Sequence, residues 1–92
     1  MFIAMVIGTV VSTRKDEALV GQKILMVQPL DAHMEPDGKI EVAVDSVGAG
    51  TGEIVLVTMG SIASKPFENS NAPIDCTIVG IIDSVEASNK GR

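Results

Sequence analysis

The sequence predicts an all-β fold, a small barrel or sandwich of five short strands with one short helical turn. Three observations predict it. The apolar residues are mostly Val and Ile, whose branched Cβ atoms suit a pleated strand. Segments rich in glycine, proline and polar residues separate the apolar runs. No long segment has the apolar periodicity of an amphipathic helix.

Each element follows from a local pattern. The five strands are expected at residues 3–11, 23–29, 40–47, 53–59 and 76–85. Gly8 interrupts the first strand and indicates a bend or a close backbone approach. Residues 12–22 are polar and turn-like, and Pro36-Asp37-Gly38 is a strong turn signal. The short helical turn is expected between residues 60 and 66, before a polar loop at 68–73.

The third strand shows the clearest alternation, which is typical of a strand with two different faces. One face carries Ile40, Val42 and Val44, and the other carries Glu41, Ala43 and Asp45. The first, fourth and fifth strands are instead apolar on both faces. In the first, Phe2, Ala4, Val6 and Val10 oppose Ile3, Met5, Ile7 and Val11; in the fifth, Ile78 and Ile82 oppose Val79 and Ile81.

Strands that are apolar on both faces are normally covered on both, whereas a small barrel buries only its inner face. No helix is predicted that would cover the outside. The chain has only 92 residues, which indicates one domain with a polar tail from about residue 87 and a limited core. These observations predict a homo-oligomer; the alternative is that single apolar residues lie at the surface, which is common.

Composition excludes several classes of protein. Cys76 and His33 are the only residues of their types, so one chain forms neither a disulfide nor a zinc site of Cys and His ligands. The net charge of −5 argues against nucleic acid, and two phenylalanines provide no platform for stacking bases. No apolar run is long enough to span a membrane, and the apolar start lacks the features of a signal peptide. A cytoplasmic protein is expected.

The stretch DSVGAGTGE, residues 45–53, raises the question of a phosphate site. A dinucleotide-binding loop needs G-x-G-x-x-G before a helix, and a P-loop needs Gly-Lys-Ser/Thr. Here the spacing is G-x-G-x-G, no Lys follows Gly52, and the next segment is a predicted strand without a helix N-terminus. Glu53 adds a negative charge where a phosphate would lie. The loop is therefore interpreted as a strand connection with positive φ angles or close backbone approach.

No residue stands out as catalytic. Cys76 begins an apolar strand, where a buried and inert thiol is expected. His33 lies in a predicted surface loop, with no nucleophile paired with it in sequence. Asp45, Asp75 and Asp83 lie at or near strand ends. They could pair for acid–base chemistry, but Asp at such places more often accepts hydrogen bonds from turn amides.

Three separated blocks carry a resemblance to a known family. The first comprises Gly8, Val10, Thr13, Lys15, Leu19, Val20, Gly21, Leu25, Val27, Gln28 and Pro29. The second runs from Val42 to Gly50 and continues with Gly52, Glu53, Val55, Leu56, Val57, Gly60 and Ser61. The third comprises Pro73, Asp75, Ile78, Val79, Gly80, Ile81 and Asp83. In this order they resemble the EutN/CcmL family of vertex proteins from bacterial microcompartment shells.

The resemblance implies a five-stranded OB-like β-barrel, a cyclic homopentamer, and a structural protein without catalytic activity, cofactor or metal. Such pentamers cap the vertices of a polyhedral shell in the cytoplasm, next to hexagonal shell proteins. The expected subunit interface comprises Asp45, Val47, Gly48, Ala49, Gly50, Gly52, Glu53, Gly60 and Ser61. The chain departs from the family at Ser61-Ile62-Ala63-Ser64, where Ser-Ser-Ala-Arg is frequent, and at Asp75-Cys76-Thr77, where Asp-Ala-Ala is common. An OB-like module that binds a small ligand or nucleic acid is the alternative function.

Overall fold

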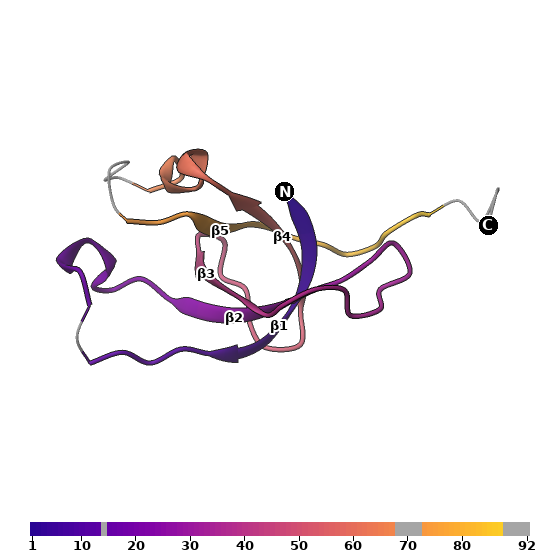
Figure 1. Cartoon of the computed structure of the whole chain (residues 1–92), viewed down its shortest axis with the longest axis horizontal. Helices are drawn as coiled ribbons and strands as arrows, with labels where there is room; N and C mark the ends of the chain where they lie inside the picture. Colours follow the sequence, from indigo (N-terminus) through magenta and orange to yellow (C-terminus); the bar gives the residue numbers. More distant parts are fainter. Residues whose placement is uncertain (14, 68–72, 88–92) are drawn as a thin grey trace.

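The computed structural model describes residues 1–13, 15–67 and 73–87, and in it the chain forms a closed five-stranded barrel (Figure 1). The strands are β1 (Phe2–Thr9), β2 (Ile24–Pro29), β3 (Glu41–Asp45), β4 (Ile54–Met59) and β5 (Cys76–Ile81). All five predicted strands are confirmed; β1 begins one residue earlier than predicted and ends two residues earlier, and the other four lie within the predicted ranges. The barrel also decides between the two predicted architectures. The polar loop expected at 68–73 and the tail expected from about 87 lie almost entirely outside the described residues.

The strands follow the order β1-β2-β3-β5-β4 around the barrel. Neighbouring strands are antiparallel except β3 and β5, which run parallel. The register of β1 against β2 shifts between Val6 and Gly8. Such a shift is a β-bulge, which bends a strand and helps to close a small barrel. The bend predicted at Gly8 is therefore confirmed.

The core fills the barrel with small and branched side chains. Its fully or almost fully buried members are Ala4, Val6, Leu25, Val27, Ala43, Ala49, Val55, Val57, Cys76 and Ile78. They alternate along each strand with residues that point outward, as the pleat requires. Phe2 packs against this cluster from the edge.

The alternation along β3 is present, but its less apolar face enters the core. Ala43 is 1% exposed and Asp45 is 9% exposed, whereas Val42 is 53% exposed on the outside. Ala43 pairs with the buried Leu25 of β2, and this register fixes which face points inward. Hydrophobicity alone would place Val42 inside; the narrow barrel interior instead accepts the smaller alanine.

A second apolar cluster covers part of the outer surface of β2 and β3. Val44, Ala63 and Ile74 are buried in it, and Ala18, Leu19, Ile24 and Phe67 pack around them. Two short 3-10 helices contribute, η1 (Glu17–Leu19) and η2 (Ser61–Ser64). The predicted helical turn is η2. η1 was not predicted; Asp16 caps it by accepting a 2.8 Å hydrogen bond from the Ala18 N–H.

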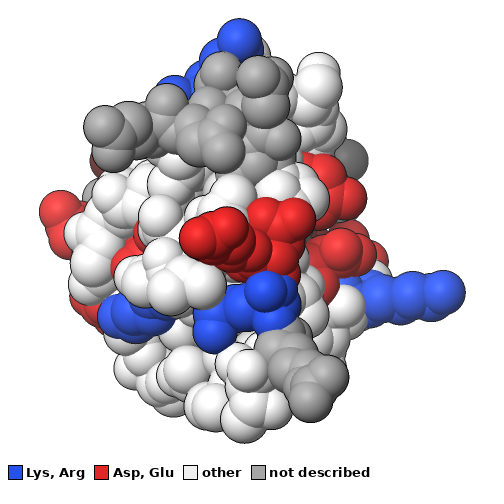
Figure 2. All heavy atoms as spheres, turned by 90° about the vertical axis from the view of Figure 1, so that its left-hand side faces the viewer, with Lys and Arg blue, Asp and Glu red and all other residues white. Residues whose placement is uncertain are grey.

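The charged residues do not form a single-sign surface on the end of the barrel that carries η1 and η2. Figure 2 shows acidic and basic side chains next to each other there. Within the described residues, no helix has the length and apolar character needed to cross a membrane.

Candidate subunit interface

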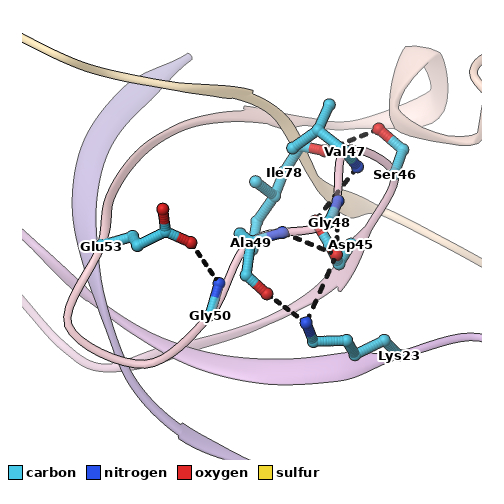
Figure 3. A network of polar contacts seen from close by, with 9 residues as sticks. All are labelled: Lys23, Asp45, Ser46, Val47, Gly48, Ala49, Gly50, Glu53 and Ile78. Carbon is cyan, nitrogen blue, oxygen red and sulfur yellow. Dashed lines mark hydrogen bonds and ion pairs between the residues drawn. The ribbon is translucent and has the colours of Figure 1, made fainter.

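The glycine-rich loop from Ser46 to Glu53 runs across one end of the barrel, and the Asp45 side chain holds its first half (Figure 3). The Asp45 carboxylate accepts hydrogen bonds from three consecutive backbone N–H groups, those of Val47 at 3.2 Å, Gly48 at 2.9 Å and Ala49 at 3.0 Å. A buried carboxylate with several amide donors is well satisfied and fixes the loop around it. The expectation that such an Asp accepts from turn amides is confirmed for Asp45.

Lys23 completes this arrangement from the start of β2. Its ammonium group donates to the Ala49 carbonyl oxygen and lies 3.9 Å from Asp45 Oδ2. The Lys23 side chain is half exposed, whereas the Asp45 carboxylate is 4% exposed. Sequence reasoning missed Lys23, because it lies 26 residues before Ala49 and no local pattern connects the two.

The second half of the loop is attached to β1. The Gly52 N–H donates to the Val6 carbonyl at 2.8 Å, and the Val6 N–H donates to the Glu53 carbonyl at 3.0 Å. The Glu53 carboxylate accepts a 2.6 Å hydrogen bond from the Gly50 N–H. The loop amides that would bind an anion therefore already donate to Asp45, Glu53 or the Val6 carbonyl. This geometry supports the prediction that the loop is not a phosphate site.

The three glycines of the loop have different reasons for being glycine. Gly48 and Gly52 have φ angles of 84° and 91°, a region that residues with a Cβ rarely adopt. Gly50 lies outside this region, and a Cβ there would meet only Glu53 Oε1 at 3.6 Å, an ordinary contact. The folded chain alone therefore requires glycine at 48 and 52 and does not require it at 50.

The residues predicted for the interface fall into three sets: two buried residues, the accessible residues of the loop, and a separate pair after β4. Asp45 and Ala49 are buried within their own chain, so they shape the loop without presenting a surface. Val47, Gly48, Gly52 and Glu53 are exposed, and Gly50 is half-buried. Gly60 and Ser61 are also exposed, but they follow the far end of β4, roughly 23 Å from Glu53 if seven residues are extended.

The residues considered for catalysis are not brought together. Burial, and then the charges of Glu41 and Asp75, raise the pKa of Cys76 to about 11, which keeps the thiol protonated at neutral pH. His33 is exposed. Asp75 precedes β5 and Asp83 follows it eight residues later, roughly 26 Å away if the chain between them is extended. Within the described part of the chain, no three His, Cys, Asp or Glu side chains are grouped as metal ligands.

The loop that contains His33 is held by Asp31. The Asp31 carboxylate accepts hydrogen bonds from the backbone N–H groups of Glu35 at 3.1 Å and His33 at 2.8 Å. These bonds, that of Glu35 foremost, hold the pKa of Asp31 below its ordinary value of 3.8. The tight turn therefore lies at residues 31–34, before the predicted Pro36-Asp37-Gly38 signal, although Gly38 does have a positive φ of 104°.

Comparison with known proteins shows a family and several relatives that match this chain over most of its length. Residues 1–83 match the family model described as ethanolamine utilisation protein EutN/carboxysome. The microcompartment shell vertex protein GrpN of Rhodospirillum rubrum is 49% identical over 89 residues, which cover 97% of this chain and all of that protein. The carboxysome shell vertex protein CcmL of Synechocystis is also 49% identical over 89 residues, covering 97% of this chain and 89% of that protein.

Solved structures of proteins from this family have the same fold as this chain. A structure described as the GrpN pentameric microcompartment shell protein from Rhodospirillum rubrum superposes with a TM-score of 0.88 at 50% identity, covering 96% of this chain and all of that one. The structure of CcmL from Gloeobacter violaceus superposes with a TM-score of 0.90 at 43% identity, covering 97% of this chain and 92% of that one. Because the family model matches residues 1–83 of the chain and the relatives are near half identical, this chain belongs to the EutN/CcmL family, whose members named here are shell vertex proteins.

Proposed function

We propose that this protein is a structural component of a bacterial microcompartment shell in the cytoplasm, where a ring of five copies closes a vertex next to hexagonal shell proteins. The observation that carries the proposal is the match in sequence and fold to a shell protein described as pentameric, over nearly the full length of both chains. A cyclic ring is a closed arrangement of identical subunits, and it suits a small barrel whose outer surface is partly apolar. The function requires no catalytic group.

The glycine loop and the Gly60 end of β4 are proposed to contact neighbouring copies. In a ring, each subunit uses two different patches, one toward each neighbour. The separation of the two groups by the length of β4 is compatible with this requirement. The Asp45 carboxylate and Lys23 would act indirectly, by holding the loop in one shape before assembly.

An OB-like binding module is less well supported than a shell component. Both aromatic side chains are used in packing: Phe2 lies against the main core and Phe67 against the second cluster. Neither is therefore a free platform on which a base would stack. Binding of single-stranded DNA at physiological salt would favour this alternative over the shell function.

Native mass spectrometry of the purified protein at micromolar concentration tests the ring directly. The expected species has five times the mass of one chain, and a stable monomer would contradict the proposal. A co-expressed hexagonal microcompartment shell protein should then yield closed particles with this protein and open sheets or tubes without it. Gly50→Val tests the loop: the monomer should fold, since Gly50 is unstrained, while the ring weakens. Thr13→Val, at an exposed position outside the loop and the Gly60 end of β4, is the control.

A further inference from the structure

Two apolar rows cross the outer surface of the barrel on different walls. The first row, centred on β2, consists of Gly8, Met26 and Val42, which are direct partners across β1, β2 and β3. The second row, centred on β4, consists of Ile3, Leu56 and Gly80, which are direct partners across β1, β4 and β5. Cross-strand partners point to the same face of a sheet, so each row is a continuous strip.

The first row continues a surface that the chain covers only in part. Ile24 and Val44, the neighbouring outward pair of β2 and β3, belong to the second apolar cluster, and Val44 is 7% exposed. At the next outward pair, Met26 and Val42, this cover ends. Val42 is 53% exposed, and Ile40, just before β3, is 52% exposed. Val42 and Ile40 therefore form an exposed apolar patch beside Met26.

The second row contains a glycine that the folded chain does not require. Gly80 lies inside β5, outside the left-handed region, and a Cβ there would meet only Leu56 Cβ at 3.6 Å. Gly8 differs, because a Cβ there would lie 2.9 Å from Met26 Cε. A glycine inside a strand is unfavourable and often marks a bulge or a place where another backbone approaches closely. The register of β4 against β5 shifts beside Gly80, between Leu56 and Val57. At Gly80 no side chain of its own strand lies over Leu56, its partner on β4.

We propose that these rows are the two halves of one contact between neighbouring copies: Val42 of one copy, with Ile40 beside it, packs over Gly80 and against Leu56 of the next. This inference rests on the proposed ring and adds a contact between strand surfaces to the glycine loop and the Gly60 end of β4, which are already proposed to face the neighbouring copies. A ring contact joins two different patches, and these rows meet β1 at Gly8 and Ile3, near its opposite ends. The contact removes the exposed Val42 and Ile40 from water, which favours association.

Disulfide trapping with the double variant Val42→Cys and Gly80→Cys tests this contact. Val44 pairs with Thr77, so Val42 is level with Asp75, and Gly80 lies five residues further along β5. This offset is roughly 16 Å, beyond the reach of a disulfide, so the two cysteines of one chain cannot join. Cys76 does not interfere, because it is buried and its pKa is raised to about 11. The Cβ introduced at position 80 has room.

After mild oxidation, a denaturing gel without reductant should show a ladder of covalent species up to five chains. The control pairs Val20→Cys with Gly80→Cys, since Val20 is 65% exposed and belongs to neither row. A ring by native mass spectrometry without a ladder above this control would overturn the assigned contact and leave the proposed function intact. Absence of any ring in the unmodified protein would instead contradict the proposed function, and the contact with it.

A substitution without chemical linkage gives a second readout. Val42→Asp places a charge in the contact, and the dissociation constant of the ring should rise at least tenfold, as expected for loss of a buried valine. The barrel itself should keep its fold, because Val42 is exposed in the single chain. Val20→Asp should leave the ring unchanged. Equal ring affinity for the Val42→Asp and Val20→Asp variants would overturn the inference.

Discussion

At the residue scale, the single side chain of Asp45 holds the first half of the glycine loop. Its carboxylate binds three successive amides, and its burial leaves little solvent to compete with them. Hydrogen bonds to a charged acceptor are stronger than those between neutral groups, and an amide left without a partner in a buried site costs additional free energy. Lys23 lies close enough to balance the charge. The loop therefore depends on Asp45 as well as on Gly48 and Gly52.

Asp45→Ala is expected to lower the free energy of unfolding by about 2–4 kcal/mol, because three loop amides lose their acceptor. Asp45→Asn should cost less, since its amide oxygen still accepts. Urea denaturation at a fixed protein concentration measures both. The interpretation would be contradicted by an Asp45→Ala variant that loses less than about 1 kcal/mol.

Cys76 gives a pH dependence with a definite sign. The pKa of its thiol is raised from the ordinary value of 9.0 to about 11 in the fold, chiefly by burial. Between these values the unfolded chain releases the proton while the folded chain keeps it. The unfolded state then binds fewer protons, so stability falls as pH rises above about 9. Between pH 8 and 11, the free energy of unfolding should fall more steeply with pH for the parent than for Cys76→Ala. The same pH dependence in both proteins would contradict the assignment of this effect to Cys76.

At the scale of elements, η2 is joined to the barrel through Thr77 of β5. The Thr77 hydroxyl donates a 2.5 Å hydrogen bond to the Ala63 carbonyl, and both residues are fully buried. This bond joins β5 to Ala63 of the second cluster. The short helix has too few residues to be stable alone, so it depends on such tertiary contacts.

Thr77→Val should lower the free energy of unfolding by about 1–2 kcal/mol, because the shape is kept while the buried Ala63 carbonyl loses its donor. Hydrogen exchange at the amides of Ala63 and Lys65 should accelerate more than exchange in β2. Thr9→Val, at an exposed position of β1, is the control. Unchanged protection at η2 would show that this bond does not hold the helix.

At the scale of the whole molecule, assembly should supply part of the stability. A chain of 92 residues buries a smaller fraction of its surface than a larger domain does. Large apolar side chains such as Val42, Ile40 and Ile62 are more than half exposed in the single chain. Their burial between copies would link folding to association.

Thermal unfolding should therefore depend on concentration. A hundredfold rise in protomer concentration stabilises each chain of a five-membered ring by about 2 kcal/mol, which corresponds to roughly 10 °C in Tm for a domain of this size. Scanning calorimetry or fluorescence with an external dye across this range measures the shift. A Tm that is independent of concentration would contradict a contribution of ring assembly to stability.

The strand segments and the turn at Gly60 could be predicted from the sequence because their signals are local. Branched residues favour strands, and Gly48, Gly52 and Gly60 occur where φ is positive. The interpretation of Asp45 as an acceptor for turn amides also rests on neighbours within four residues. η1 was missed because its three residues carry no periodicity, only the Asp16 cap.

Residue types and their spacing were sufficient to predict the all-β class, the approximate strand positions and the resemblance that leads to the EutN/CcmL family. That Ala43 faces the core while Val42 faces outward became evident from the fold alone, because strand register depends on partners such as Leu25. The fold also decided that Lys23 reaches the glycine loop, and that Gly50 and Gly80 are unstrained while Gly48 and Gly52 are not. These properties depend on residues that are distant in sequence or on backbone angles. Neither can be read from apolar periodicity or from residue type.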